Sequence, residues 1–297
     1  MRNFILGTDW WSDCDDVVAL RLLCRAHKEK KINLLGIGIN ACMEYSAPSV
    51  EGFLNLENVK DVAVGIDLSP AKISGIEHAK YQKRLSASSK NIKSNSDAED
   101  AVKMYRRLIA EADGAVEILE IGFLQVIAKA LMSEPDEISP LSGIELFRKK
   151  VKKVWVMGGN WETDKGKEHN FINGMAAKRG ASVLVKNCPV PITFLGFEIG
   201  FKVKTGGDIL KKDDPLYLAM LDHGSEKGRW SWDPMLCMMA LIGDEGKAGY
   251  NTICGTAKVN GNTGENSFVK NEKGLHKYVT FAKDYDFYAN QINEYIK

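Results

Sequence analysis

The sequence predicts an α/β protein with an open, mainly parallel sheet, flanking helices and a Rossmann-like core. Short apolar runs alternate along the chain with segments of helical periodicity. Runs that are buried on both faces and separated by helices are typical of parallel βαβ units. Polar residues also follow directly after several of these runs, which is where ligands bind in open parallel sheets.

Each element is predicted from its own stretch of sequence. Apolar runs predict strands at 3–8, 33–40, 61–66, 116–121, 153–157 and 191–197. Helical periodicity predicts helices at 15–29, 47–55, 99–112, 124–132, 175–186, 215–223 and 234–241. After residue 242 we expect late strands at 252–259 and 278–282 around an NGNTG turn, and a closing helix at 283–297. The polar stretch 86–96 predicts a surface loop. No composition shift, linker or internal repeat divides the chain, so we predict a single domain over 1–297.

The charge balance excludes several function classes. Lys plus Arg number 40 and Asp plus Glu number 39, which leaves a net charge of +1. That balance argues against a nucleic-acid footprint or a membrane-surface patch. The six cysteines are scattered without a CxxC pair, which argues against a zinc ribbon or a disulfide framework. No apolar run is long enough to be a signal segment or to span a membrane. We therefore expect a reduced, cytoplasmic protein.

Polar residues at the ends of the predicted strands outline a candidate site. They are Asp9, Asn40, Gly122, Asn160 with its two preceding glycines, and Glu198, after the first, second, fourth, fifth and sixth strands. Their coincidence at one edge of the sheet is stronger evidence than any single motif.

Four aspartates crowd the turn after the first strand. Asp9, Asp13, Asp15 and Asp16 lie within eight positions, where their charges repel. A capped helix start would explain one or two of them. A hard cation such as Ca²⁺ would resolve the repulsion, because it binds several carboxylate and carbonyl oxygens. The loop lacks the glycine and glutamate of an EF-hand, and Trp11 stands where a phosphoaspartyl D-x-D motif needs its second aspartate.

The stretch GTDWWSDCDDVVAL (7–20) resembles the signature D-T-D-P-G-x-D-D-A of the inosine–uridine-type nucleoside hydrolases. Gly7 replaces the first aspartate, and two additional residues lengthen the loop before Asp15 and Asp16. Further motifs resemble those of the family in the same order, namely IGFLQVIAKAL (121–131), KVWVMGG (153–159), EHN (168–170), ITFLGFEIG (192–200) and SWDP (231–234). The resemblance covers about residues 3–245.

The resemblance implies a Ca²⁺-dependent hydrolase. Such an enzyme would cleave the N-glycosidic bond of a purine or modified-purine ribonucleoside to ribose and free base, as in purine salvage. The family also suggests a homodimer or homotetramer whose partner is the small-molecule nucleoside. Cleavage passes through an oxocarbenium-like sugar cation, and a metal can lower the pKa of water and orient hydroxyls.

The resemblance also assigns roles to individual residues. Asp9, Asp16, Asp233 and the main-chain carbonyl of Gln125 would bind Ca²⁺, with Asp9 as general base on the metal-bound water. The predicted sugar ligands are Asp15, Asn40, Asn160, Glu168 and Asn170. Asp13 has no counterpart in the common motif, and we expect it to be a turn or cap residue. Each assignment also has a structural alternative, such as an N-cap for Asp233 or a solvated loop for the EHN element.

One departure from the family affects the leaving base. The histidine that often precedes the late metal-binding aspartate, and protonates the base, is replaced by Trp232. An indole cannot donate that proton, but it can stack on a purine. His169 and His223 are the nearby alternatives as acids. Five tryptophans lie in predicted loops around the site, at positions 10, 11, 161, 230 and 232. They indicate either an aromatic wall for a flat base or ordinary core packing.

Two further functions fit the same residues. The substrate could be another N-ribosyl compound, such as a nucleotide or a vitamin riboside, which would need a basic anchor for its phosphate. The chain could also bind a nucleoside or ribose without catalysis. Trp232 favours that interpretation, and the retained Asp9 opposes it.

Overall fold

The computed structural model describes residues 1–69 and 79–297. Its main strands are β1 Arg2–Thr8, β2 Ile32–Ile39, β3 Ala63–Ile66, β4 Glu99–Asp100, β5 Val116–Glu120, β6 Val151–Met157, β7 Ile192–Leu195, β10 Tyr250–Val259, β11 Asn266–Lys270 and β12 His276–Phe281. A separate small sheet pairs β8 (Lys204–Thr205) with β9 (Arg229–Trp230).

The helices connect these strands. The longer ones are α1 Asp15–Lys28, α2 Ser46–Leu56, α4 Ala101–Glu111, α8 Gly174–Asn187, α10 Pro215–His223, α11 Trp232–Ile242 and α12 Tyr285–Ile296. The shorter ones are α3 Lys80–Ser86, α5 Gln125–Leu131, α6 Gly143–Lys150, α7 His169–Ile172 and α9 Phe197–Gly200, with 3₁₀ turns η1 at Asn95–Asp97 and η2 at Gly207–Ile209.

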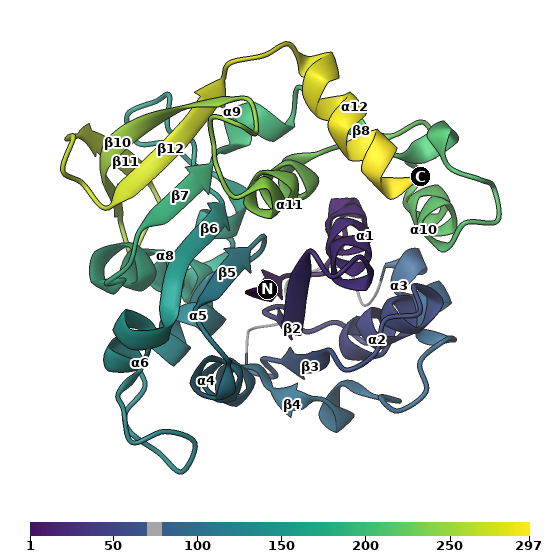
Figure 1. Cartoon of the computed structure of the whole chain (residues 1–297), viewed down its shortest axis with the longest axis horizontal. Coiled ribbons are helices and arrows are strands. Elements are labelled where there is room, and N and C mark those ends of the chain that lie inside the picture. Colours follow the sequence, from purple (N-terminus) through teal and green to yellow (C-terminus); the bar gives the residue numbers. More distant parts are fainter. Residues whose placement is uncertain (70–78) are drawn as a thin grey trace.

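The strands of the described residues form one ten-stranded sheet in the order β11-β10-β12-β7-β6-β5-β1-β2-β3-β4. Every pair from β12 through β4 is parallel, and β10 runs antiparallel to both of its neighbours. The prediction of an open, mainly parallel sheet with flanking helices is confirmed (Figure 1).

The sheet lies between two layers of helices. Successive residues of a strand point to opposite faces, so Phe4 and Leu6 of β1 pack with α1, α2, α10, α11 and α12, whereas Ile5 packs with α4, α5, α6 and α8. Figure 1 shows helices on both sides of the strands. This two-sided burial explains why the strands appear in the sequence as continuous apolar runs.

The chain reverses its winding direction at β1. It proceeds from β1 to β2 and β3 on one side, and later through β5, β6 and β7 on the other, so that β1 lies between β2 and β5. Such a switch point leaves a crevice beyond the carboxyl ends of the adjacent strands. The aspartate loop after β1 and the loop after β5 both begin there.

Several elements differ from those predicted. The last predicted parallel strand ends at Leu195, because Phe197 and Glu198 already belong to α9. The helices α3 and α6 and the edge strand β11 were not predicted, since their short segments give little periodicity. Most of the polar stretch 86–96 is a loop as predicted.

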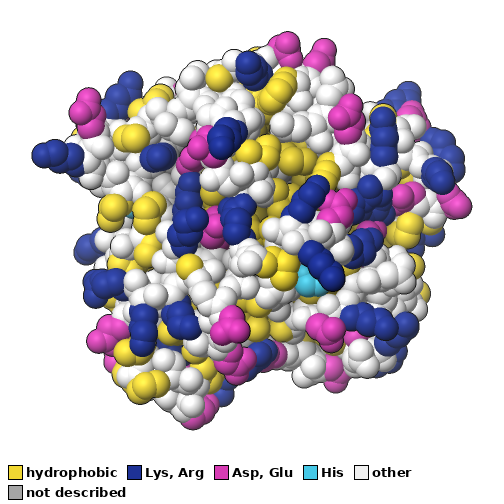
Figure 2. All heavy atoms as spheres, in the orientation of Figure 1, with side chains coloured by type: hydrophobic (Ala, Val, Ile, Leu, Met, Phe, Trp, Pro, Cys, Tyr) yellow, Lys and Arg dark blue, Asp and Glu magenta, His cyan; other side chains and the backbone are white. Residues whose placement is uncertain are grey.

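The surface agrees with the near-neutral charge. On the face drawn in Figure 2, basic and acidic side chains are interspersed around hydrophobic side chains near the centre. Among the described residues, no helix combines the length and apolarity needed to cross a bilayer.

Candidate functional site

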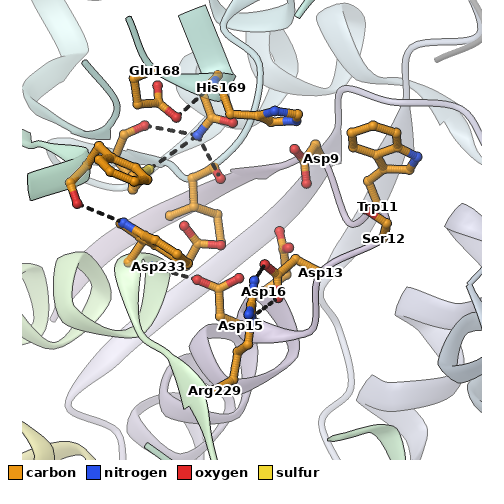
Figure 3. Close-up of a pocket in the computed structure, with 15 residues that line it drawn as sticks. Asp9, Trp11, Ser12, Asp13, Asp15, Asp16, Glu168, His169, Arg229 and Asp233 are labelled. Atoms are coloured by element: carbon orange, nitrogen blue, oxygen red, sulfur yellow. Dashed lines mark hydrogen bonds and ion pairs between the residues drawn. The ribbon is translucent and has the colours of Figure 1, made fainter. Parts of the chain in front are cut away.

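A cavity of about 220 Å³ lies at the switch point of the sheet. Its walls come from the aspartate loop and α1, the ends of β5 and β6, α7, α9, β9 and α11. The lining residues are Asp9, Trp11, Ser12, Asp13, Asp15, Asp16, Ile121, Met157, Glu168, His169, Asn170, Phe197, Arg229, Trp232 and Asp233. Segments that are distant in the sequence therefore meet at one edge of the sheet (Figure 3).

Four buried aspartates share this cavity. Asp15, Asp16 and Asp233 each offer an oxygen atom, and these atoms lie within 4.8 Å of one another. Asp9 lines the same cavity but is not part of that trio. All four side chains are buried, with exposed fractions of 8% or less.

Burial and mutual repulsion oppose ionisation of these carboxylates. Burial raises the pKa of Asp9 to about 8, and the charges of Asp15 and Asp13 add to the effect. Burial likewise raises the pKa values of Asp15, Asp16 and Asp233 well above the ordinary value, together with the charges of neighbouring aspartates. A cation among them would reverse both effects, because it favours the charged form of each group.

The local backbone positions the cluster. The Thr8 hydroxyl donates a hydrogen bond to Asp16 Oδ1, and the Trp10 N–H donates to the same atom at 3.3 Å. Trp10 adopts a left-handed conformation with φ +43°, which turns the chain sharply after β1. The N–H of Asp233, in the first turn of α11, donates to Asp15 Oδ2 at 3.3 Å.

Glu168 and Asn170 form another side of the cavity. Glu168 accepts the N–H of Asn170 at 2.8 Å and that of Gly159 at 3.1 Å, and burial raises its pKa to about 7. The Asn170 amide nitrogen donates to the carbonyl of Met157 at 3.2 Å. Its nitrogen is thereby directed into the protein, which leaves the amide oxygen available to a ligand.

Three predicted site residues do not line the cavity. Asn40 is fully buried after β2, and its Oδ1 accepts the N–H of Phe123 at 2.9 Å, while its Nδ2 has no partner among the described residues. Gln125 begins α5 and donates its side-chain amide to the Asn40 carbonyl. The main chain of Asn160 is paired with the side chain of Asn266: its N–H donates to Asn266 Oδ1 at 3.0 Å, and its carbonyl accepts from Asn266 Nδ2 at 2.9 Å.

Only two of the five loop tryptophans border the cavity. Trp11 and Trp232 line it, and the Trp232 indole stacks on Phe197 with centroids 5.7 Å apart. Trp10 and Trp161 are buried in the core, so core packing is the correct interpretation for both. Trp230 lies under the Lys204 ammonium, 4.4 Å from its ring centroid. The aromatic wall therefore consists of Trp11, Trp232 and a residue that sequence reasoning missed, Phe197.

An ion pair at the cavity was also missed. Arg229 of β9 binds Asp13 through two nitrogens, with Nε 2.8 Å from Oδ1. Burial opposes ionisation of Asp13, but Arg229 outweighs it and lowers the pKa of Asp13. Asp13 also accepts the N–H of Cys14 at 2.7 Å, as a turn residue would. The partners are separated by 216 positions, and no local pattern in the sequence indicates their contact.

Comparison with known proteins supports the fold. No protein-family model and no curated protein matches the sequence. Among solved structures, an inosine-uridine preferring nucleoside hydrolase from Bacillus anthracis shares 16% identity at a TM-score of 0.67, over 100% of this chain and 99% of that one. A purine-preferring ribonucleoside hydrolase from Gardnerella vaginalis shares 15% identity at a TM-score of 0.70, over 100% and 99%. The type III effector protein XopQ, complexed with adenosine diphosphate ribose, shares 14% identity at a TM-score of 0.73, over 100% and 93%. The α/β fold of this chain is therefore that of the nucleoside hydrolases.

Proposed function

We propose that the protein hydrolyses the N-glycosidic bond of a ribonucleoside, with preference for a purine or modified purine, to ribose and free base. The observation that carries the proposal is the convergence of four buried aspartates with Glu168 and Asn170 on one cavity of this fold. Purine salvage in the cytoplasm by a homodimer or homotetramer would suit this activity.

The buried carboxylates fit a divalent cation. We assign Asp9, Asp16 and Asp233, which line the cavity, to Ca²⁺, because hard cations take oxygen ligands and the aspartates otherwise repel one another. Gln125, whose main-chain carbonyl the family resemblance adds as a ligand, lies outside that lining. Asp15 lies close enough to Asp16 and Asp233 to contribute as well. Calcium bound there would lower the pKa of water and hold ribose hydroxyls in place.

The chain's own residues would perform the remaining steps. Asp9 would accept the proton of the attacking water as general base. The ribose hydroxyls would be held by Asp15, Glu168 and Asn170, which line the cavity. Asn40 and Asn160, which the family resemblance also assigns to the sugar, lie outside that lining. Trp232 would stack on the base, supported by Phe197. Glu168 suits a sugar hydroxyl because its oxygens are already oriented by two backbone N–H groups.

Release of free ribose from a nucleoside panel, with and without EDTA, tests the proposal. We expect turnover of purine nucleosides that EDTA abolishes and added Ca²⁺ restores. Asp9→Asn should lower kcat by about 10²-fold or more, whereas Asp208→Asn, an exposed carboxylate paired with Lys212, should be unaffected. Ribose release that is insensitive to EDTA would exclude the cation, and release from no nucleoside would refute the hydrolase.

A second candidate is an N-ribosyl compound that carries phosphate. Arg229 places a guanidinium in the cavity, and XopQ was solved with adenosine diphosphate ribose. Isothermal titration with inosine, its 5′-monophosphate and adenosine diphosphate ribose separates the candidates. Tighter binding of the phosphates, lost in Arg229→Met, would favour this alternative. Binding without ribose release from any compound would indicate a non-catalytic binding protein.

A further inference from the structure

His169 occupies a position in the cavity that suits a proton donor. It is the first residue of α7, and its imidazole lines the cavity together with Asp9. The ring stacks on Trp11 with centroids 5.4 Å apart and an interplanar angle of 18°. Phe123 contacts it from another direction, with centroids 5.9 Å apart. Figure 3 shows the imidazole and the Trp11 indole near Asp9.

Asn173 can serve both protonation states of this ring. Its Nδ2 lies 3.1 Å from His169 Nε2, and donates to it when the ring is neutral. An asparagine amide can also turn and accept a hydrogen bond through Oδ1. The His169 side chain is therefore held between aromatic rings and the Asn173 amide, which can hydrogen-bond to the imidazole whether or not Nε2 carries a proton.

The other candidates for a leaving-group acid are otherwise engaged. The Trp232 indole N–H donates to the Phe197 carbonyl at 3.0 Å, and an indole is no acid. The Arg229 guanidinium is bound to Asp13. His223 is not among the residues that line the cavity, and its Nδ1 lies 2.8 Å from Ser225 Oγ.

We propose that His169 protonates the departing base, and this inference rests on the proposed hydrolase function. As the bond between C1′ and the base nitrogen breaks, its electron pair passes to the base, and His169 delivers a proton to a ring nitrogen. The water oxygen bonds to C1′, and its proton passes to Asp9. Exchange with solvent then returns a proton to His169 and removes one from Asp9, so that the cycle balances as nucleoside plus water giving ribose plus base.

The electrostatic surroundings have two opposite effects on this role. Burial lowers the pKa of His169, while the charge of Asp13 opposes that shift. A lower pKa makes the imidazolium a stronger acid toward the leaving nitrogen, and it also leaves a smaller fraction of the ring protonated at neutral pH.

The test compares leaving groups that differ in their need for a proton. Inosine must be protonated to leave, whereas 4-nitrophenyl β-D-ribofuranoside releases a stable anion. His169→Phe preserves an aromatic ring on Trp11, and His169→Gln preserves a hydrogen-bonding group beside Asn173. Both variants should lower kcat on inosine by about 10²-fold or more, with less than about a five-fold loss on the nitrophenyl riboside and little change in KM. His223→Gln is the matched control and should retain both activities.

Two measurements separate the possible failures. Equal losses on both substrates in a variant that melts like the wild type would refute proton donation, and so would full activity on inosine. If the wild type releases ribose from neither substrate, the proposed function itself fails. Two variants of different shape keep the test valid if one of them does not fold.

Discussion

Glu120 is the last residue of β5, and its side chain is fully buried. Tyr105 donates a hydrogen bond to its Oε1 at 2.8 Å, while Oε2 has no hydrogen-bond partner among the described residues. Burial raises the pKa of Glu120 from 4.5 to about 8, and the Tyr105 bond only partly opposes that shift. We predict that this carboxyl group makes the protein less stable as the pH rises.

The sign and size follow from proton binding. Above pH 4.5 the unfolded chain releases the proton of Glu120, whereas the folded protein keeps it up to about pH 8. The folded state therefore binds more protons across this window, and stability falls as the pH rises through it. Each pH unit costs up to about 1.4 kcal/mol, so the loss between pH 5 and pH 8 is at most ~4 kcal/mol.

Thermal melting of the wild type and Glu120→Gln at several pH values measures this effect. The glutamine cannot ionise, so its melting temperature relative to the wild type should rise by several degrees between pH 5 and pH 8. Other titrating groups contribute to both proteins and cancel in the difference. Glu111→Gln, an exposed change on the neighbouring helix α4, should show a constant offset. A constant offset for Glu120→Gln would refute the reasoning.

Three further changes test other contacts. Gly7→Ala should destabilise the fold by about 1–3 kcal/mol, because its Cβ would collide with the Glu120 carboxylate and the Tyr105 hydroxyl. Adding Glu120→Ala removes the closer of these contacts and should restore part of the melting temperature; no restoration would contradict this. Trp232→Ala should lower activity on purine nucleosides about tenfold to a hundredfold, since base stacking is worth ~1–3 kcal/mol, and should leave the Ca²⁺ affinity nearly unchanged. Trp232→Phe should retain most of the activity, and full activity of the alanine variant would exclude stacking. Asn170→Ala should reduce the preference for ribo- over deoxyribonucleosides, and an unchanged ratio of kcat/KM would place Asn170 outside the sugar site.

The sequence by itself determined the fold class and most of its elements. The apolar runs are continuous because β1, β5 and β6 are covered on both faces, and that pattern is visible residue by residue. The location of the cavity also followed from local information, because Asp9 comes directly after β1 and parallel strands end at one edge.

Only the tertiary structure decided which side chains share the cavity. Asp13 with Arg229, Trp232 with Phe197, and His169 with Trp11 are contacts between segments that no periodicity connects. The same limitation explains why the sequence left open whether Trp10 and Trp161 line the site or pack in the core, where they lie. A tryptophan in a loop can turn toward either without any change in sequence pattern. Local sequence determines which strands and helices form, but side-chain direction in a loop depends on the elements that pack around it, and those meet only in the folded chain.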